Sequence, residues 1–133
     1  MNPESKFYRE LKTAIKDVDF QRIETSTGSG VPDLNCCSFD GKECWIELKV
    51  EQAGGKVFLR KEQYAWGFRR AKMWKGKVWV AARALRSVRW YRFPHFQVEP
   101  RGNSGKYVTI KTHWQYETPM DSLDDALSFL FTY

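Results

Sequence analysis

Two carboxylates and one ammonium group between residues 30 and 49 could carry out chemistry together. Asp33, Glu47 and Lys49 lie in the stretch GVPDLNCCSFDGKECWIELK. Two carboxylates a few ångströms apart repel and raise each other's pKa unless a cation lies between them. A hard divalent cation such as Mg²⁺ takes oxygen ligands and can activate a bound water, and a nearby lysine would add positive charge beside a phosphate. Taken alone, Glu-x-Lys is also common on the polar edge of an ordinary solvent-facing strand. The arrangement of the chain around it must therefore decide between that interpretation and a metal site.

A β-hairpin between these residues determines whether the two carboxylates meet. A two-residue loop at Asp40-Gly41 would send Asp33 and Glu47 to opposite faces of the sheet. A three-residue loop from Phe39, with Gly41 left-handed as a bulge, sets Asp33 opposite Glu47. We predict the three-residue loop because it separates apolar from polar side chains. The apolar face then holds Leu34, Cys36, Cys44, Ile46, Leu48 and Val50, and the site face holds Asp33, Asn35, Cys37, Trp45, Glu47 and Lys49.

The order of three short motifs resembles the PD-(D/E)XK nuclease superfamily, above all its Holliday junction resolvases and VRR-NUC replication-repair nucleases. The motifs are Gly30-Val31-Pro32-Asp33-Leu34, Ile46-Glu47-Leu48-Lys49 and Gln63 in LRKEQ, and the resemblance covers residues 4–83. It implies that Asp33, Glu47 and the carbonyl of Leu48 bind the metal and that Lys49 assists the nucleophilic water. It implies that Gln63 supports the water or the phosphate.

The amino-terminal segment offers one further candidate ligand. Residues 4–18 predict an amphipathic helix, and its apolar residues recur every three or four positions. At about 100° per residue, Glu4 lies only about 20° from the direction of Leu11, on the stripe that faces the sheet, whereas Glu10 lies about 100° away. We therefore select Glu4 as the extra metal ligand, and the resolvase-type resemblance points to the same residue. A plain helix-capping acid is the alternative.

The resemblance implies an α/β (α+β) fold with a restriction-endonuclease-like α-β-β-β-α-β core, in which helices flank a central mixed sheet. The residue pattern agrees, with a strand at 20–25, the hairpin, a mobile exit loop at 51–55 and a helix at 60–74. Strands at 77–83 and 87–93 follow. We expect one domain over 1–133, with the core at about 4–93 and an extension at about 94–133. In the extension we expect a loop at 94–106, a strand at 107–111 and a short helix at 122–131. The side chains expected to face inward are Tyr64, Ala65, Phe68, Ala71, Leu123, Ala126, Leu127 and Leu130.

Positive charge is concentrated in one third of the chain. Residues 60–92 hold eleven Lys or Arg and one acid, so their net charge is +10. The other residues sum to −4, which gives the whole chain +6. Such a surface suits a polynucleotide backbone, and its aromatic residues could stack on unpaired bases. Core packing is the alternative for these aromatics, and we prefer it for Tyr64 and Trp79. The candidate DNA-binding residues are Arg60, Lys61, Arg69, Arg70, Lys72, Lys75, Ser26 and Thr27.

Composition excludes several classes of protein. No apolar run approaches 18 residues and the amino terminus lacks the apolar block of a signal peptide, so we expect a cytoplasmic protein without a membrane span. The three cysteines fit reduced thiols, and no Cys/His spacing indicates zinc. We also expect no small-molecule cofactor.

Three functions remain. The preferred one is a Mg²⁺-dependent endodeoxyribonuclease that cuts branched DNA as a homodimer, in recombination or repair, with Mn²⁺ able to substitute. The second is the same chemistry on flaps, nicks or duplex DNA. The third is a DNA-binding protein that has lost catalysis, which the intact Asp33, Glu47 and Lys49 argue against. Candidate dimer surfaces are the strand around Trp90-Tyr91 and the carboxyl-terminal helix with Phe129, Phe131 and Tyr133.

Overall fold

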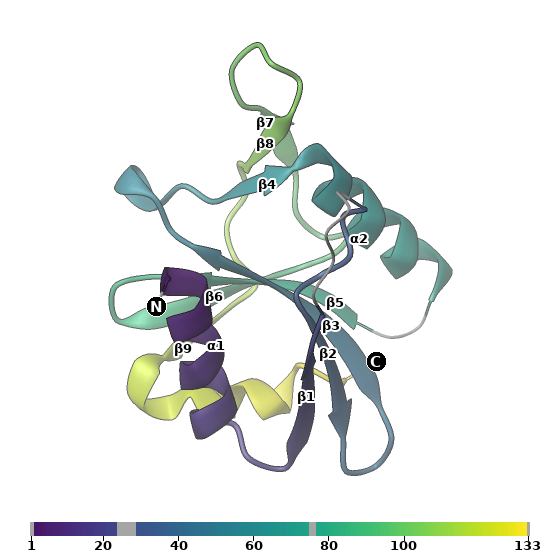
Figure 1. Ribbon diagram of the computed structural model, residues 1–133, viewed down its shortest axis with the longest axis vertical. Helices are drawn as coiled ribbons and strands as arrows, with labels where there is room; N and C mark the ends of the chain where they lie inside the picture. The colour runs from purple at the N-terminus through teal and green to yellow at the C-terminus, as the bar shows by residue number, and fades with distance from the viewer. Residues whose placement is uncertain (1, 24–28, 75–76, 133) are drawn as a thin grey trace.

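A mixed six-stranded sheet runs through the middle of the molecule (Figure 1). The computed structural model describes residues 2–23, 29–74 and 77–132. The strands lie in the order β1-β2-β3-β5-β6-β9, and of their pairings only β3 with β5 is parallel. Their bounds, with those of the two α-helices, are α1 Pro3–Ala14, β1 Val18–Arg22, β2 Leu34–Ser38, β3 Glu43–Val50, α2 Lys61–Met73, β5 Lys77–Arg83, β6 Ser87–Arg92 and β9 Tyr116–Pro119. The predicted mixed sheet flanked by helices is confirmed.

The β2–β3 hairpin has the predicted register. Leu34 pairs with Ile46 and Cys36 with Cys44, as a three-residue loop requires. Gly41 has φ +80°, in the left-handed region, and its N–H donates to the carbonyl of Ser38 at 3.0 Å. This register brings most polar side chains of the two strands onto one face of the sheet and most apolar side chains onto the other.

Each face of the sheet covers its own hydrophobic core. The first core lies under α1 and a 3₁₀ helix, η2 (Met120–Ser128), and contains Leu34, Cys36, Cys44, Ile46 and Leu48 from the hairpin. The second core lies under α2 and contains Val78, Val80, Ala82, Tyr91 and Phe93. Trp45, on the site face of β3, packs edge-on against Trp66 of α2, with ring centroids 5.3 Å apart. The site face is thus largely covered, and only part of it is polar.

α1 ends earlier than its apolar periodicity predicts. Asn2 caps the helix by accepting a hydrogen bond from the N–H of Ser5 at 2.8 Å, and the helix stops at Ala14. Asp17 has φ +65°, which breaks the helix, and Val18 begins β1 and pairs with Ser38. The prediction of a helix through residue 18 is wrong because ladder hydrogen bonds to β2 replace the last helical turn. β1 likewise spans Val18–Arg22 rather than residues 20–25.

A second, three-stranded sheet, absent from the sequence prediction, lies over the start of α2. It consists of β4 (Phe58–Arg60), β8 (Tyr107–Ile110) and β7 (Val98–Pro100), in the order β4-β8-β7. The predicted strand at 107–111 is confirmed as β8, whereas the predicted loop at 94–106 contains β7. The segment predicted as an exit loop contains a short 3₁₀ helix, η1 (Ala53–Gly55). β9, also missed, closes the edge of the main sheet beside β6.

Two side chains predicted to face inward are exposed. Ala65 lies on the outer side of α2, although Tyr64, Phe68 and Ala71 pack against the second core as expected. Leu127 is 40% exposed because η2 is a 3₁₀ helix, whose three-residue period brings Leu123 and Ala126 inward instead. Leu130, just after η2, is buried as predicted. Among the described residues, no helix is long and apolar enough to cross a membrane.

Candidate active site

The carboxyl end of β3 and the residues just before β2 form the candidate site. Asp33 precedes β2, and its Oδ2 accepts a hydrogen bond from the N–H of Leu48 at 2.8 Å. The N–H and C=O of a strand residue point to the same side, so the carbonyl of Leu48 is directed toward Asp33. β3 holds this geometry firmly because it lies between β2 and β5, with Leu48 opposite Ala81.

Glu47 is a buried carboxylate, and among the described residues only one of its two oxygens accepts a hydrogen bond. Its side chain is 5% exposed, and its Oε2 accepts a hydrogen bond from Gln63 Nε2 at 2.9 Å and lies 3.5 Å from Lys49 Nζ. Its Oε1 is buried without a hydrogen-bond partner among the described residues. Burial, followed by the negative charge of Asp33, raises the pKa of Glu47 well above its usual 4.5, against the lowering effect of Lys49.

Gln63 connects this carboxylate to α2. While its amide nitrogen donates to Glu47, its Oε1 accepts a hydrogen bond from the N–H of Arg60, just before the helix, at 2.8 Å. Gln63 is 9% exposed, so both contacts are sheltered from water. The side chain therefore fixes the start of α2 and the orientation of the Glu47 carboxylate together.

Glu4 and Glu10, the two glutamates of α1 weighed as ligands, face different surroundings. Glu4 lines a pocket together with Lys49, and its pKa is raised by partial burial and then by the charge of Asp33. Glu10 forms a two-pronged ion pair with Arg83, in which both nitrogen–oxygen distances are 3.1 Å. Glu4 thus lies next to the candidate site, whereas Glu10 does not, and the role of Glu4 as a ligand stays a prediction.

The donor set suits a hard cation. Among the described residues, no three Asp, Glu, His or Cys side chains gather into a metal-binding group. A cation would instead be held by Asp33 and Glu47, with main-chain and water oxygens completing its shell, as Mg²⁺ prefers. The buried Oε1 of Glu47 fits this, because a bound cation would interact with an oxygen that accepts no hydrogen bond from the residues described.

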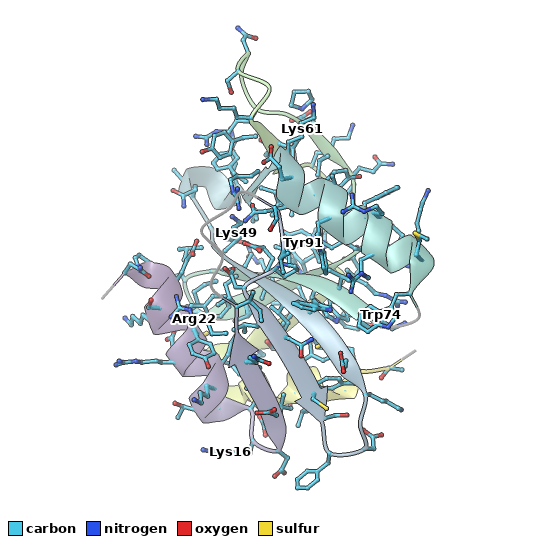
Figure 2. The ribbon with its side chains drawn as sticks, turned by 45° about the vertical axis from the view of Figure 1, so that its right-hand side comes forward. Lys16, Arg22, Lys49, Lys61, Trp74 and Tyr91 are labelled. Atoms are coloured by element: carbon cyan, nitrogen blue, oxygen red, sulfur yellow. The ribbon has the colours of Figure 1, made fainter. Side chains whose placement is uncertain are left out.

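The predicted DNA-binding residues lie mainly along α2. Lys61, Arg69 and Lys72 are exposed at helical spacings of eight and three residues, so they share one face of the helix. Figure 2 shows Lys61 at the start of α2, above Lys49 of the candidate site. The Arg70 guanidinium lies 4.5 Å from the centroid of the Trp66 ring. The other candidates are Arg60, which is half-buried, and Ser26, Thr27 and Lys75, which lie outside the described residues.

Most aromatics of the basic segment cannot stack on bases. Trp66, Trp90 and Tyr91 are buried, as is Trp79, for which core packing was preferred. The proposed dimer surface at Trp90-Tyr91 is also wrong, because β6 lies between β5 and β9 and Trp90 is fully buried. Phe129 and Phe131, offered as a second surface, pack into the first core, and Tyr133 lies outside the described residues.

Sequence reasoning missed two features around the site. Gly67 allows α2 to approach the sheet, because a Cβ there would lie 2.5 Å from the ring of Phe93. A glycine one turn after Gln63 was the only signal of this contact. The second missed feature is Phe58 and Tyr107 in the small sheet, which line the pocket beside Lys49. The strand of Tyr107 was predicted, but that of Phe58 is only three residues long, and nothing in the sequence indicated that the two strands pair beside Lys49.

The mixed sheet and the helices on its two faces define a resolvase-like fold. A solved structure with this fold is Hjc, a Holliday junction resolvase from the archaeal hyperthermophile Archaeoglobus fulgidus. The match has a TM-score of 0.60 and 12% sequence identity, and it covers 92% of this chain and 95% of that chain. Identity at this level shows a shared fold. No protein-family model and no curated protein matches the chain.

Proposed function

We propose that the protein is a Mg²⁺-dependent endodeoxyribonuclease that hydrolyses phosphodiester bonds in branched DNA. The observation that carries this proposal is Glu47, a buried carboxylate beside Asp33 and Lys49. Gln63 holds one of its oxygens, and the other has no hydrogen-bond partner in the part of the chain that the structure describes. A buried carboxylate in this state destabilises the metal-free protein, so its presence calls for a functional explanation.

Each residue has a distinct role in the proposal. Asp33 and Glu47 would hold the cation, with the Leu48 carbonyl and, at the edge of the site, Glu4. When bound there, Mg²⁺ would lower the pKa of a water and offset charge on the scissile phosphate. Lys49 places its ammonium group, 3.5 Å from Glu47, where it favours a negative charge on the phosphate or the attacking water.

The surface of α2 supports DNA as the substrate. Lys61, Arg69 and Lys72 form a cationic row that begins within two residues of Gln63, so a bound backbone would pass close to the carboxylates. The likeness to Hjc, described as a Holliday junction resolvase, supports a branched substrate. Two symmetric cuts across a junction need two sites, so we propose a homodimer.

The decisive experiment incubates the protein with a four-way junction, a flap and a linear duplex, each with Mg²⁺, Mn²⁺ or EDTA. We expect paired symmetric nicks on the junction with either metal and none with EDTA. Cutting of all three DNAs would support metal-dependent phosphodiester hydrolysis and would contradict a preference for junctions. Binding without cleavage in Mg²⁺ and Mn²⁺ would refute the nuclease assignment.

Matched variants assign the roles. Asp33→Asn should abolish cleavage and preserve or tighten DNA binding, because less negative charge then meets the phosphates. Glu10→Gln is the control on α1, since Glu10 pairs with Arg83 away from the site, and it should cut normally. Loss of binding in Asp33→Asn with unchanged cleavage per bound complex would contradict the role given to Asp33.

A further inference from the structure

A pocket of about 420 Å³ opens directly beside the candidate catalytic lysine. Glu4 of α1 and Lys49 of β3 line one side, and they are its charged lining residues. Phe58 of β4 and Tyr107 of β8 line it from the small sheet. Figure 1 shows why these segments can meet, since the amino end of α1 lies below η1 and β4.

Strand pairing places the two aromatic residues on one face of the small sheet. Arg60 pairs with Tyr107 and Phe58 with Thr109, so Phe58 and Tyr107 are diagonal neighbours that point the same way. Leu59, between Phe58 and Arg60, points to the opposite face and is fully buried in the second core. The outer face of the small sheet therefore contributes to the pocket, and its inner face packs on the second core.

A cation accompanies these rings. The guanidinium of Arg101 lies 3.7 Å from the centroid of the Phe58 ring and 5.8 Å from that of Tyr107. Tyr107 is 40% exposed, so part of its ring is accessible from solvent. We call Phe58, Tyr107 and Arg101 the aromatic cluster. Its ring faces and its positive charge are the two features that single-stranded nucleic acid uses when it binds protein.

We propose that this pocket binds one unpaired nucleotide of the DNA, with its base against the aromatic cluster and its phosphate toward Lys49. A paired base cannot enter because both of its faces are stacked within the duplex. The pocket volume lies within the range of pockets that hold small ligands. This inference rests on the proposed function and adds that the branched substrate presents a nucleotide at its branch point, unpaired as in a flap or opened as in a junction, next to the cleaved bond.

Binding measured in EDTA tests the pocket separately from cleavage. The full chain is titrated with a flap DNA that carries 2-aminopurine at the first unpaired position, and with the fully paired duplex. We expect tighter binding to the flap, together with quenching of 2-aminopurine fluorescence through stacking. Tyr107→Ala should reduce affinity for the flap by about tenfold, within the range measured for removal of one stacking aromatic, and should abolish the quenching. Affinity for the duplex should stay unchanged.

Three controls sharpen the result. Tyr107→Phe keeps the ring and should bind as the unaltered protein does. Phe39→Ala removes an aromatic residue that is 87% exposed in the hairpin loop, at the other end of β3, and should change nothing. Arg101→Ala, an exposed position, should weaken flap binding and leaves the fold intact, as thermal melting would verify.

The possible failures are distinguishable. If Tyr107→Ala binds flap and duplex as the unaltered protein does, or if an abasic flap binds as tightly as a normal flap, the pocket assignment is overturned and the nuclease proposal stands. Absence of any DNA binding refutes both. Competition by free deoxyadenosine monophosphate at micromolar concentration would reassign the pocket to free nucleotides and overturn its role in DNA recognition.

Discussion

Gly30 and Glu62 are in backbone contact. Gly30 has φ +84°, and a Cβ built on it would overlap the carbonyl oxygen of Glu62 and lie 2.5 Å from its carbonyl carbon. The loop that leads to Asp33 therefore packs directly on the first turn of α2, from which Gln63 reaches Glu47. This single contact brings the separate sequence motifs of the site together.

Gly30→Ala is expected to lower the free energy of unfolding by about 2–4 kcal/mol, because a left-handed alanine and a backbone overlap both cost energy. Chemical denaturation measures the change. Gly41→Ala is the matched control, since Gly41 has φ +80° and a Cβ there meets nothing within 4 Å. It should cost only about 1 kcal/mol. Equal losses in the two variants would contradict the contact between Gly30 and Glu62.

Glu47→Gln is expected to stabilise the metal-free protein by about 1–3 kcal/mol at pH 7, because it replaces a buried carboxylate whose Oε1 accepts no hydrogen bond within residues 2–23, 29–74 and 77–132. The amide oxygen can still accept the hydrogen bond from Gln63. Denaturation in EDTA measures the gain, and cleavage should be lost in the same variant. A variant less stable than the unaltered protein in EDTA would show that the carboxylate is satisfied without metal.

The gain in Glu47→Gln should depend on pH. Since the pKa of Glu47 is raised on folding, its contribution to stability is present below about pH 4.5 and lost as pH rises through the raised pKa. The stability difference between variant and unaltered protein should therefore be small at pH 4 and grow toward neutral pH. Denaturation across this pH range in EDTA measures it, and a constant difference would argue against the raised pKa.

Gln63→Ala is expected to reduce cleavage more than DNA affinity, because the residue orients Glu47 and does not lie on the cationic face of α2. Loss of the bond to the N–H of Arg60 should also cost about 1 kcal/mol of stability. Single-turnover cleavage and binding in EDTA separate the two effects. Gln97→Ala, an exposed position, is the control. A pure loss of affinity in Gln63→Ala would assign Gln63 to DNA contact instead.

The cationic face of α2 is expected to determine the salt dependence of DNA binding. The double variant Arg69→Ala/Lys72→Ala should reduce the slope of log affinity against log salt by about 1.8, or 0.9 per lost phosphate contact. Lys12→Ala/Lys16→Ala removes the same charge from the exposed side of α1 and its following turn, and Figure 2 shows Lys16 at the far end of the molecule from Lys61. Its slope should stay near that of the unaltered protein.

The hairpin could be predicted from sequence because its apolar and polar residues alternate in step with the two faces of the sheet. Of the two loops compared, only the three-residue loop puts Leu34, Ile46 and Leu48 on the side opposite Asp33 and Glu47, and the structure has the register of that loop. The order of α1, the three strands, α2 and β5 was implied by the family resemblance, and the residue pattern of each segment agreed with it. Local patterns placed most side chains on the correct face, but Ala65 of α2 is exposed against its prediction.

Contacts between distant segments could not be predicted in this way. β4 and β7 are three residues long, and they form strands only because β8 lies between them. The contact of Gly67 with Phe93 and the pairing of Glu10 with Arg83 join residues more than twenty positions apart. The roles of Asp33, Glu47, Lys49 and Gln63 remain predictions, although the structure brings these side chains together.

Gln63 has its two polar atoms engaged in opposite directions, one toward the helix start and one toward Glu47. Any displacement of α2 along its axis would therefore turn the carboxylate or break a sheltered bond. α2 and the candidate site are therefore coupled, so a ligand that shifts α2 would move the Glu47 carboxylate through the side chain of Gln63.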